Sequence, residues 1–308
     1  MSATSRQRVF VTGATGFVGS FLTRQLVEAG RDVAILLRPT SDSWRIADVI
    51  DRVHVIDGTM EDVAGFAPRL ADFRPDAVAH LAWRGVTNQF RNDVSQTLNV
   101  AESIALYSSA RASGCERFVG MGSQAEYGPV SARLDETVPT RPTTVYGAAK
   151  LSTALMLERL AEADGLSFAW LRLFSSYGPK DDLSWLIPYM ARRLLAGERP
   201  ALTPGEQIWD YIYVEDAAAA VAAALDSAAT GCFNLGSGEG RPLRSIIEKV
   251  RDQIDPNLAL GFGEVPYRPD QVMHLEANID ALKAATGWEP RVPIEEGLAK
   301  TISWLRTV

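Results

Sequence analysis

Residues 11–19 read VTGATGFVG, and this stretch decides the fold that we predict. Its glycines, at 13, 16 and 19, follow an apolar segment at 9–11 and precede a helical pattern over 17–29. Glycines permit a tight turn and a close approach to a pyrophosphate, and a helix N-terminus offers unpaired N–H groups to it. The GxxGxxG spacing differs from the common GxGxxG pattern, so its place in a strand–turn–helix unit carries the prediction of dinucleotide binding. The expected contacts are Gly13, Thr15, Gly16, Phe17, Val18 and Gly19.

The pattern of that first unit continues along the chain. Apolar segments at 33–37, 53–56, 77–81, 118–121 and 168–173 are typical of strands buried on both faces, and helical patterns cover 94–113 and 146–163. This alternation predicts an α/β fold, a Rossmann-like doubly wound parallel sheet. After about residue 173 proline and glycine become frequent and helical patterns dominate, which indicates a smaller, mostly helical C-terminal substrate lobe.

The domain boundaries follow from the same pattern. We expect residues 209–221 and 231–236 to return to the main sheet. The cofactor-binding Rossmann domain is therefore predicted to comprise 1–172 and 209–236, and the substrate lobe 173–208 and 237–308.

Composition excludes several classes of protein. The chain of 308 residues has a net charge of −7 and no cluster of basic residues, which argues against nucleic-acid binding. The longest apolar run, AAAAVAAAL at 217–225, is too short to span a membrane and is typical of a buried helix. No apolar leader is expected, Cys115 and Cys232 are expected to be free thiols in the cytoplasm, and no cluster has the spacing of metal ligands, so we predict no metal.

The residue after the second strand indicates which dinucleotide is bound. An acidic residue there would accept hydrogen bonds from the adenosine ribose. This chain reads ILLRPTSD, with Arg38 at that position and Ser41 nearby. A guanidinium can pair with a 2′-phosphate, so the sequence favours NADP(H) over NAD(H), unless Arg38 is only a solvated loop charge.

A tyrosine and a lysine are the candidate catalytic pair. In VYGAAK, at 145–150, Tyr146 and Lys150 are four residues apart and share one face of a helix. A nearby cation lowers the pKa of a phenol, which lets it exchange a proton with the oxygen of a carbonyl or an alcohol. Ser123 ends a predicted strand and is expected to orient the same oxygen.

The chain resembles the extended short-chain dehydrogenases/reductases of the nucleotide-sugar epimerase/dehydratase group, and is nearest to the nucleoside-diphosphate 4-keto-6-deoxyhexose 4-ketoreductases. The motifs that carry this resemblance cover nearly the whole chain: TGATGFVG (12–19), HLA (80–82), Asn99, Ser123 with Tyr146 and Lys150, LRLFSSYGP (171–179), YIYVEDAA (211–218), FNLGSG (233–238), and GWEP and EEGL within 287–298. The resemblance implies a nicotinamide cofactor, a nucleoside-diphosphate sugar substrate and a homodimer packed through helices like 94–113 and 146–163.

The resemblance also implies further site residues. Cofactor contacts are expected from Asp57, Gly58, Leu81, Ala82, Trp83 and Asn99, and substrate contacts from Arg84, Gln124, Glu126, Ser175, Tyr177, Trp209 and Arg268. Three positions depart from the family pattern: Gly58 stands where an Asp is common, Ser175 where an Asn is common, and Trp209 where an Arg is common. Trp209 could stack on a nucleobase, or be buried between the lobes.

The stretch GSQAEYG, at 122–128, bears on the reaction. In the family's 4,6-dehydratases an Asp and a Glu follow the hydroxyl residue, whereas this chain has Gln124 and Ala125, which cannot exchange protons. No Cys and His pair matches the family's combined 3,5-epimerase/4-reductases either. Two reactions remain, an NADPH-dependent 4-ketoreduction, which Arg38 favours, and a 4-epimerisation. Reduction of another aldehyde or ketone, and a non-catalytic NADP-sensing role, are weaker alternatives.

Overall fold

The computed structural model describes residues 7–268 and 271–308. Its centre is a parallel sheet of seven strands in the order β11-β7-β5-β4-β1-β2-β3. The chain winds outward from β1 in both directions, as the predicted doubly wound fold requires. The strands are β1 (Arg8–Thr12), β2 (Asp32–Leu37), β3 (His54–Asp57), β4 (Ala77–His80), β5 (Arg117–Ser123), β7 (Ser167–Leu173) and β11 (Gly231–Leu235).

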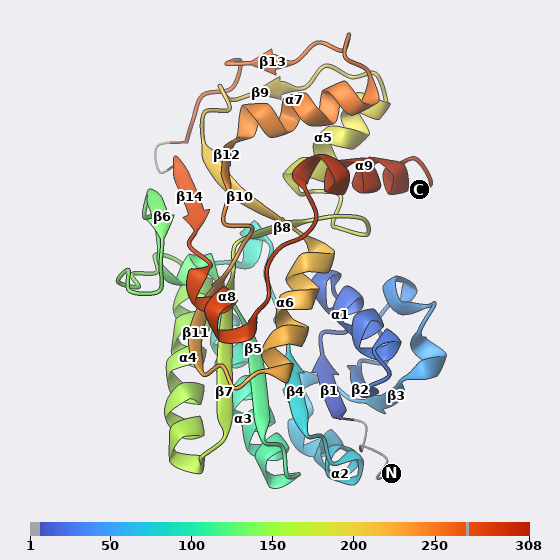
Figure 1. The fold of residues 1–308 in the computed structure, drawn as a ribbon, viewed down its shortest axis with the longest axis vertical. Helices are drawn as coiled ribbons and strands as arrows, with labels where there is room; N and C mark the ends of the chain where they lie inside the picture. The colour runs from blue at the N-terminus through green and yellow to red at the C-terminus, as the bar shows by residue number, and fades with distance from the viewer. Residues whose placement is uncertain (1–6, 269–270) are drawn as a thin grey trace.

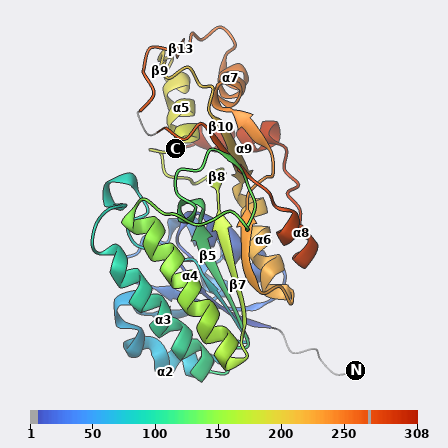
Figure 2. The same cartoon turned by 90° about the vertical axis from the view of Figure 1, so that its left-hand side faces the viewer.

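Helices cover both faces of this sheet (Figures 1 and 2). Val9 and Val11 of β1 belong to a core formed with α1 (Phe17–Glu28) and α6 (Val214–Asp226). Phe10 points to the opposite face, into a core formed with α2 (Val63–Phe73), α3 (Gln96–Ala112) and α4 (Val145–Asp164). The alternation of side chains along a strand explains why a continuous apolar segment is needed here.

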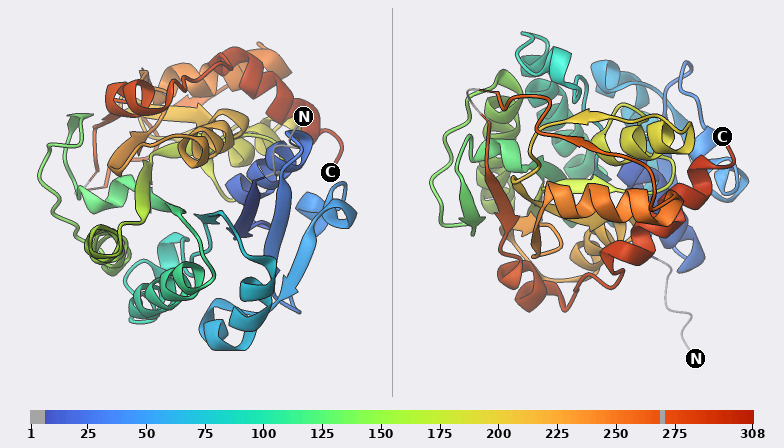
Figure 3. Two further views of the ribbon diagram at one scale, coloured as in Figure 1. Left: turned by 60° about the horizontal axis from the view of Figure 1, so that its bottom comes forward. Right: turned by 90° about the horizontal axis from the view of Figure 1, so that it is seen from above.

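The second lobe contains sheets as well as helices. Its five-stranded sheet has the order β12-β10-β14-β6, with β8 paired to β10, and β9 pairs with β13 separately. Figure 3 shows this lobe from above, with the orange helix α7 and the red helix α9 covering it. The elements are β6 (Ala132–Leu134), β8 (Ser175–Tyr177), α5 (Leu186–Leu195), β9 (Ala201–Leu202), β10 (Ile208–Tyr213), β12 (Gly240–Pro242), α7 (Leu243–Ile254), β13 (Gly261–Phe262), β14 (His274–Ala277), α8 (Asp280–Thr286) and α9 (Ile294–Leu305).

Short 3₁₀ helices complete the fold: η1 (Trp44–Ile46), η2 (Ile50–Arg52), η3 (Met60–Asp62), η4 (Asn88–Phe90) and η5 (Gln124–Glu126). Two of them bear on the site, because η1 follows β2 beside the expected cofactor position and η5 follows β5 beside Ser123.

The predicted parallel sheet is confirmed, but one segment was placed wrongly. The strand of 209–221, β10, belongs to the smaller sheet, where it pairs with β8, β12 and β14. Only the helix that follows, α6, returns to the main sheet, and it packs against α1. The alanine-rich run lies within α6 and is largely buried. Among the described residues, no helix is long and apolar enough to cross a membrane.

Candidate active site

The glycine-rich turn after β1 has room for an anion but not for side chains. Gly13 adopts a φ of +76°, and a Cβ on it would stand 2.7 Å from the Ala82 nitrogen. A Cβ on Gly19 would stand 2.0 Å from the Gly13 oxygen. Helix α1 begins beyond Gly16 without a side-chain cap and without an acidic residue in its first turn. Its first N–H groups therefore fit the diphosphate of a dinucleotide.

Two cavities meet at this turn. The larger, of about 970 Å³, is lined by both lobes, and the smaller, of about 440 Å³, is lined by the ends of β1, β2 and β4 and by α3. The larger is lined by these predicted residues: Gly13, Gly16, Phe17, Val18, Gly19, Leu81, Trp83, Ser123, Gln124, Tyr146, Lys150, Ser175, Tyr177, Trp209 and Arg268. The smaller is also lined by Thr15, Arg38, Ser41, Ala82, Arg84 and Asn99. Asp57, Gly58 and Glu126 are not among the residues that line these two cavities.

The predicted catalytic residues converge in the larger cavity. Ser123 ends β5, and Tyr146 and Lys150 lie on the first turns of α4. Helix α4 begins after Thr144, whose hydroxyl accepts the Gly147 N–H at 3.1 Å. The helix presents Tyr146 and Lys150 on one face toward the end of β5, which is the arrangement that the spacing predicts.

Burial and neighbouring polar groups act on the phenol of Tyr146 in opposite directions. Burial raises the pKa of Tyr146, whereas hydrogen bonding to Ser123 and the charge of Arg91 lower it. The carboxylate of Glu126 raises it further. The protonated form is therefore favoured in this structure, which suits a proton donor.

Lys150 is buried beneath an indole ring. Its Nζ donates to the Met121 carbonyl at 2.6 Å and lies 3.7 Å from the centroid of the Trp83 ring. Burial lowers the pKa of Lys150 to about 7, although the charge of Glu126 opposes this. The Trp83 ring also meets Tyr146 edge-on, at 6.3 Å between centroids. Trp83 therefore lies beside both predicted catalytic side chains.

Within GSQAEYG, Gln124 and Glu126 have different environments. Gln124 and Ala125 line the larger cavity, so the positions after Ser123 face the substrate space with neutral side chains. Glu126 is fully buried and was wrongly predicted to contact substrate. One carboxylate oxygen accepts from Arg172 Nε at 2.8 Å, and the other from the Ser123 N–H at 2.9 Å. Glu126 therefore holds the end of β5 in place.

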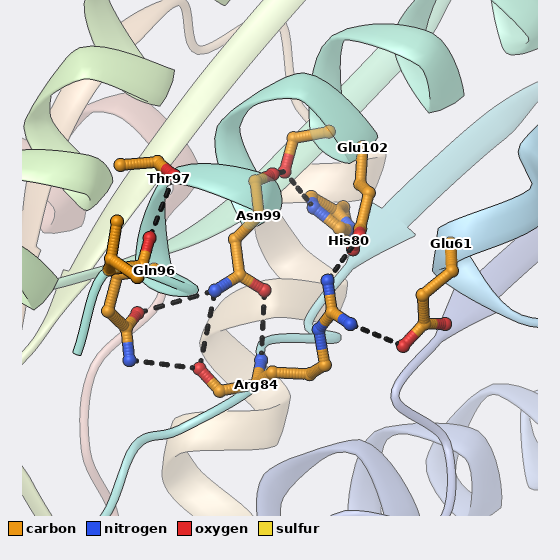
Figure 4. Close-up of polar contacts among 9 residues, drawn as sticks. Glu61, His80, Arg84, Gln96, Thr97, Asn99 and Glu102 are labelled. Atoms are coloured by element: carbon orange, nitrogen blue, oxygen red, sulfur yellow. Dashed lines mark hydrogen bonds and ion pairs between the residues drawn. The ribbon is translucent and has the colours of Figure 1, made fainter. Parts of the chain in front are cut away.

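Arg84 was also predicted to contact substrate, and the structure places it in the smaller cavity instead. Its guanidinium forms ion pairs with Glu61 and Glu102 (Figure 4). Asn99 accepts the Arg84 N–H at 3.0 Å, and Gln96 donates to the Arg84 carbonyl at 3.2 Å. These contacts from α3 fix the backbone after β4, and Arg84 lines the smaller cavity whereas Tyr146 lines the larger one. Asn99 thus holds the backbone that follows β4, and it also lines the smaller cavity.

Arg38 and Ser41 lie together at the outer end of the smaller cavity. Arg38 Nε donates to Ser41 Oγ at 3.2 Å, so guanidinium and hydroxyl face the same space. Asp42 also lines this cavity, and its carboxylate accepts the Trp44 N–H at 3.0 Å.

Several cavity residues were not predicted from the sequence, among them Arg91, Arg45 and Asp181. Arg91 lines the larger cavity beside Tyr146, Arg45 lines both cavities, and Asp181 lines the larger one. None of them belongs to a motif, and only the fold brings them to the site. His80 has a structural role: it is buried between Thr12 and Ser103, at 2.8 Å and 2.9 Å, and burial lowers its pKa to about 3. Among the described residues, no group of His, Cys, Asp and Glu could hold a metal ion.

Comparison with known proteins gives consistent matches over this fold. Residues 9–236 match the model of the NAD dependent epimerase/dehydratase family. A UDP-glucose 4-epimerase of Corynebacterium glutamicum is 28% identical, over 92% of this chain and 91% of that protein. A dTDP-glucose 4,6-dehydratase of Neisseria gonorrhoeae is 25% identical, over 99% and 97%.

Solved structures show the same architecture. A UDP-glucose 4-epimerase of Thermotoga maritima, solved with UDP-glucose, has a TM-score of 0.88 and 26% identity, covering 98% of this chain and 99% of that one. A UDP-glucose 4-epimerase of Thermus thermophilus, in complex with NAD, has a TM-score of 0.85 and 29% identity, covering 97% and 99%.

Proposed function

The chain is an enzyme of the NAD-dependent epimerase/dehydratase family, and within that family we propose that it uses NADPH to reduce the C4 ketone of a nucleoside-diphosphate 4-keto-6-deoxyhexose. The nicotinamide, when bound, supplies the hydride. The chain supplies the proton, a site for the diphosphate and a cavity between the lobes.

Tyr146 is the proton donor in this proposal. Its phenol is buried in the larger cavity and is favoured in its protonated form. The Ser123 hydroxyl, at the end of β5, orients the same sugar oxygen. Giving up the proton leaves a phenolate, which nearby positive charge stabilises.

The observation that carries the choice of cofactor is the pair formed by Arg38 and Ser41. The pair lines the smaller cavity directly after β2 and offers a guanidinium and a hydroxyl to a 2′-phosphate. Gly13, Gly16 and Gly19 would hold the diphosphate of the same cofactor. NADPH that exchanges at each turnover suits a reductase.

Dehydration is disfavoured by the two side chains that follow Ser123. Removing water from a sugar needs a group that takes a proton and a group that gives one. Gln124 and Ala125 line the cavity and can do neither. The substrate is held, in this proposal, by Trp209 against the nucleobase and by Arg268 at the diphosphate.

A 4-epimerase is the second candidate, because proteins named UDP-glucose 4-epimerase are among the relatives that match nearly the whole chain. An epimerase oxidises and then reduces C4, so it needs no net hydride and keeps its cofactor. Tyr146 would serve both steps, first as a base and then as an acid.

The decisive experiment follows the absorbance of NADPH with a panel of CDP-, dTDP-, GDP- and UDP-linked 4-keto-6-deoxyhexoses. Loss of NADPH stoichiometric with one keto sugar supports the reductase and identifies its nucleotide. No net loss with any of them, together with cofactor that copurifies with the protein, would favour the epimerase. In the active case, Tyr146→Phe should lower kcat by about 10²–10⁴-fold and spare NADPH binding. Tyr189→Phe, a change at an exposed tyrosine, should keep full activity.

A further inference from the structure

A second cation lies over the ring of the catalytic tyrosine. The Arg91 guanidinium carbon is 5.2 Å from the centroid of the Tyr146 ring, and both residues line the larger cavity. A guanidinium over an aromatic face is attracted to the ring, and it is attracted more strongly once the phenol is ionised. The tyrosine–lysine spacing does not predict Arg91.

Lys150 has other partners in this structure. Its ammonium donates to the Met121 carbonyl and lies against the Trp83 ring, 3.7 Å from its centroid. The groups that act on the pKa of Tyr146 are Ser123 of β5 and Arg91, which lower it, and Glu126 of η5, which raises it. Arg91 is therefore a cation that acts on the phenol from outside the tyrosine–lysine pair.

The position of Arg91 is fixed by the start of α4. The Tyr146 N–H donates to the Arg91 carbonyl at 2.8 Å, and the Val145 N–H donates to Asn92 Oδ1 at 3.2 Å. The first N–H groups of a helix have no partner within it, so residues 91–92 provide acceptors that they otherwise lack. The segment that carries the guanidinium is thus bound to the backbone of the residue on which it acts.

The charge of Arg91 is not neutralised by an ion pair. Within residues 7–268 and 271–308 its guanidinium forms no salt bridge, and its Nε donates only to the Val86 carbonyl, at 3.5 Å. The carboxylate that opposes it at the phenol, Glu126, is already paired with Arg172. The positive charge of Arg91 can therefore act on the groups that line the larger cavity.

We propose that Arg91 is a positioning residue that stabilises the phenolate of Tyr146, in addition to the lysine of the YxxxK pair. The proposal rests on the proposed role of Tyr146 as proton donor. When the phenol gives its proton to the sugar oxygen, the negative charge that remains on Tyr146 lies beside the guanidinium. No further reactant is needed, because Arg91 keeps its own protons.

The test is a titration of the Tyr146 phenol, which needs no sugar substrate. The protein is labelled with fluorotyrosine, whose phenol is more acidic, and is followed by fluorine NMR in the presence of NADP⁺. Tyr146→Phe identifies the signal. Arg91→Gln should raise the midpoint by about one pH unit, as expected for the loss of a unit charge at this distance. Arg91→Lys should restore most of the shift. Arg159 is an exposed arginine on α4, the helix that carries Tyr146, and Arg159→Gln should leave the midpoint unchanged.

Two outcomes would overturn the proposal. An unchanged midpoint in Arg91→Gln, with KM raised for whichever substrate is found, would make Arg91 a substrate anchor. A shift of equal size in Asn92→Ala, which keeps the charge and removes only the side-chain acceptor at Val145, would make the geometry of the helix start the cause. Melting temperatures identify variants that fail to fold. If no keto sugar is reduced, the titration still measures the charge effect, so the two proposals fail separately.

Discussion

At the scale of single residues, burial sets the protonation of the cavity groups. It lowers the pKa of Lys150 to about 7 and raises that of Asp181 to about 7. Both groups therefore change charge near neutral pH, unlike the same residues in water. Because both groups line the larger cavity, the charge of this cavity changes with pH in the physiological range.

The pH dependence of stability should depend on Asp181, which is only 5% exposed. Burial raises its pKa to about 7, so between about pH 4 and 7 the folded chain binds a proton that the unfolded chain has lost. Its contribution to stability therefore falls as pH rises through this window. Asp181→Asn should be more stable than the wild type above pH 7, by at most about 4 kcal/mol, and differ little near pH 4. Thermal melts across this range test it, and a pH-independent difference would contradict it.

Arg38 should decide between the two cofactors. Arg38→Ala removes the charge that we propose pairs with the 2′-phosphate, and such a pair is worth roughly 1.5–3 kcal/mol. We expect the Kd for NADPH to rise about 10–100-fold and the Kd for NADH to stay nearly constant. Fluorescence titration with each cofactor measures this ratio. Arg52→Ala, at an arginine away from both cavities, is the matched control. Equal losses for both cofactors would count against a 2′-phosphate site.

At the scale of elements, the end of β5 depends on one buried ion pair. Glu126 and Arg172 are 0% and 7% exposed at their side chains. Glu126→Gln leaves the guanidinium buried without a counter-charge, which should cost about 3–5 kcal/mol in the free energy of unfolding. Glu198→Gln breaks an exposed pair with Arg193 and should cost less than about 1 kcal/mol. Urea unfolding measures the loss of stability in both variants. Similar losses would show that burial does not determine the strength of the ion pair.

The same elements show what the sequence could predict. The strands of the main sheet are continuous apolar segments joined by helical patterns, and local spacing is enough to identify them. The pairing of β10 depends on strands far along the chain, so its sheet could not be assigned locally. Ser123, Tyr146 and Lys150 belong to motifs. The positions of the Arg84 and Glu126 side chains depend on their contacts with Glu102 and Arg172. These partners are distant in sequence, so local patterns could not predict them.

At the scale of the whole molecule, two neighbouring helices expose large apolar side chains. Leu98 of α3 and Leu155, Met156 and Leu160 of α4 are all exposed, and the two helices lie side by side on one face of the sheet (Figure 2). We propose that this face forms the homodimer interface, because exposed apolar side chains that cluster are typical of contact surfaces. Leu155→Lys should then give a monomer in light scattering. Val55→Lys, at an exposed valine on β3, should leave the mass unchanged. A wild type that is already monomeric would refute the interface.

The chain passes repeatedly between its two lobes. Residues 132–134 leave the main sheet for the smaller one, α4 and β7 return, β8 and β10 leave again, and α6 and β11 return once more. A chimaera that takes the substrate lobe of a relative therefore cannot be made at a single junction. Each crossing would need its own matched splice, and β10 would have to be exchanged together with its partner strands. For evolution and for the laboratory alike, new specificity in this fold is reached more readily by point substitutions in the cavity than by recombination.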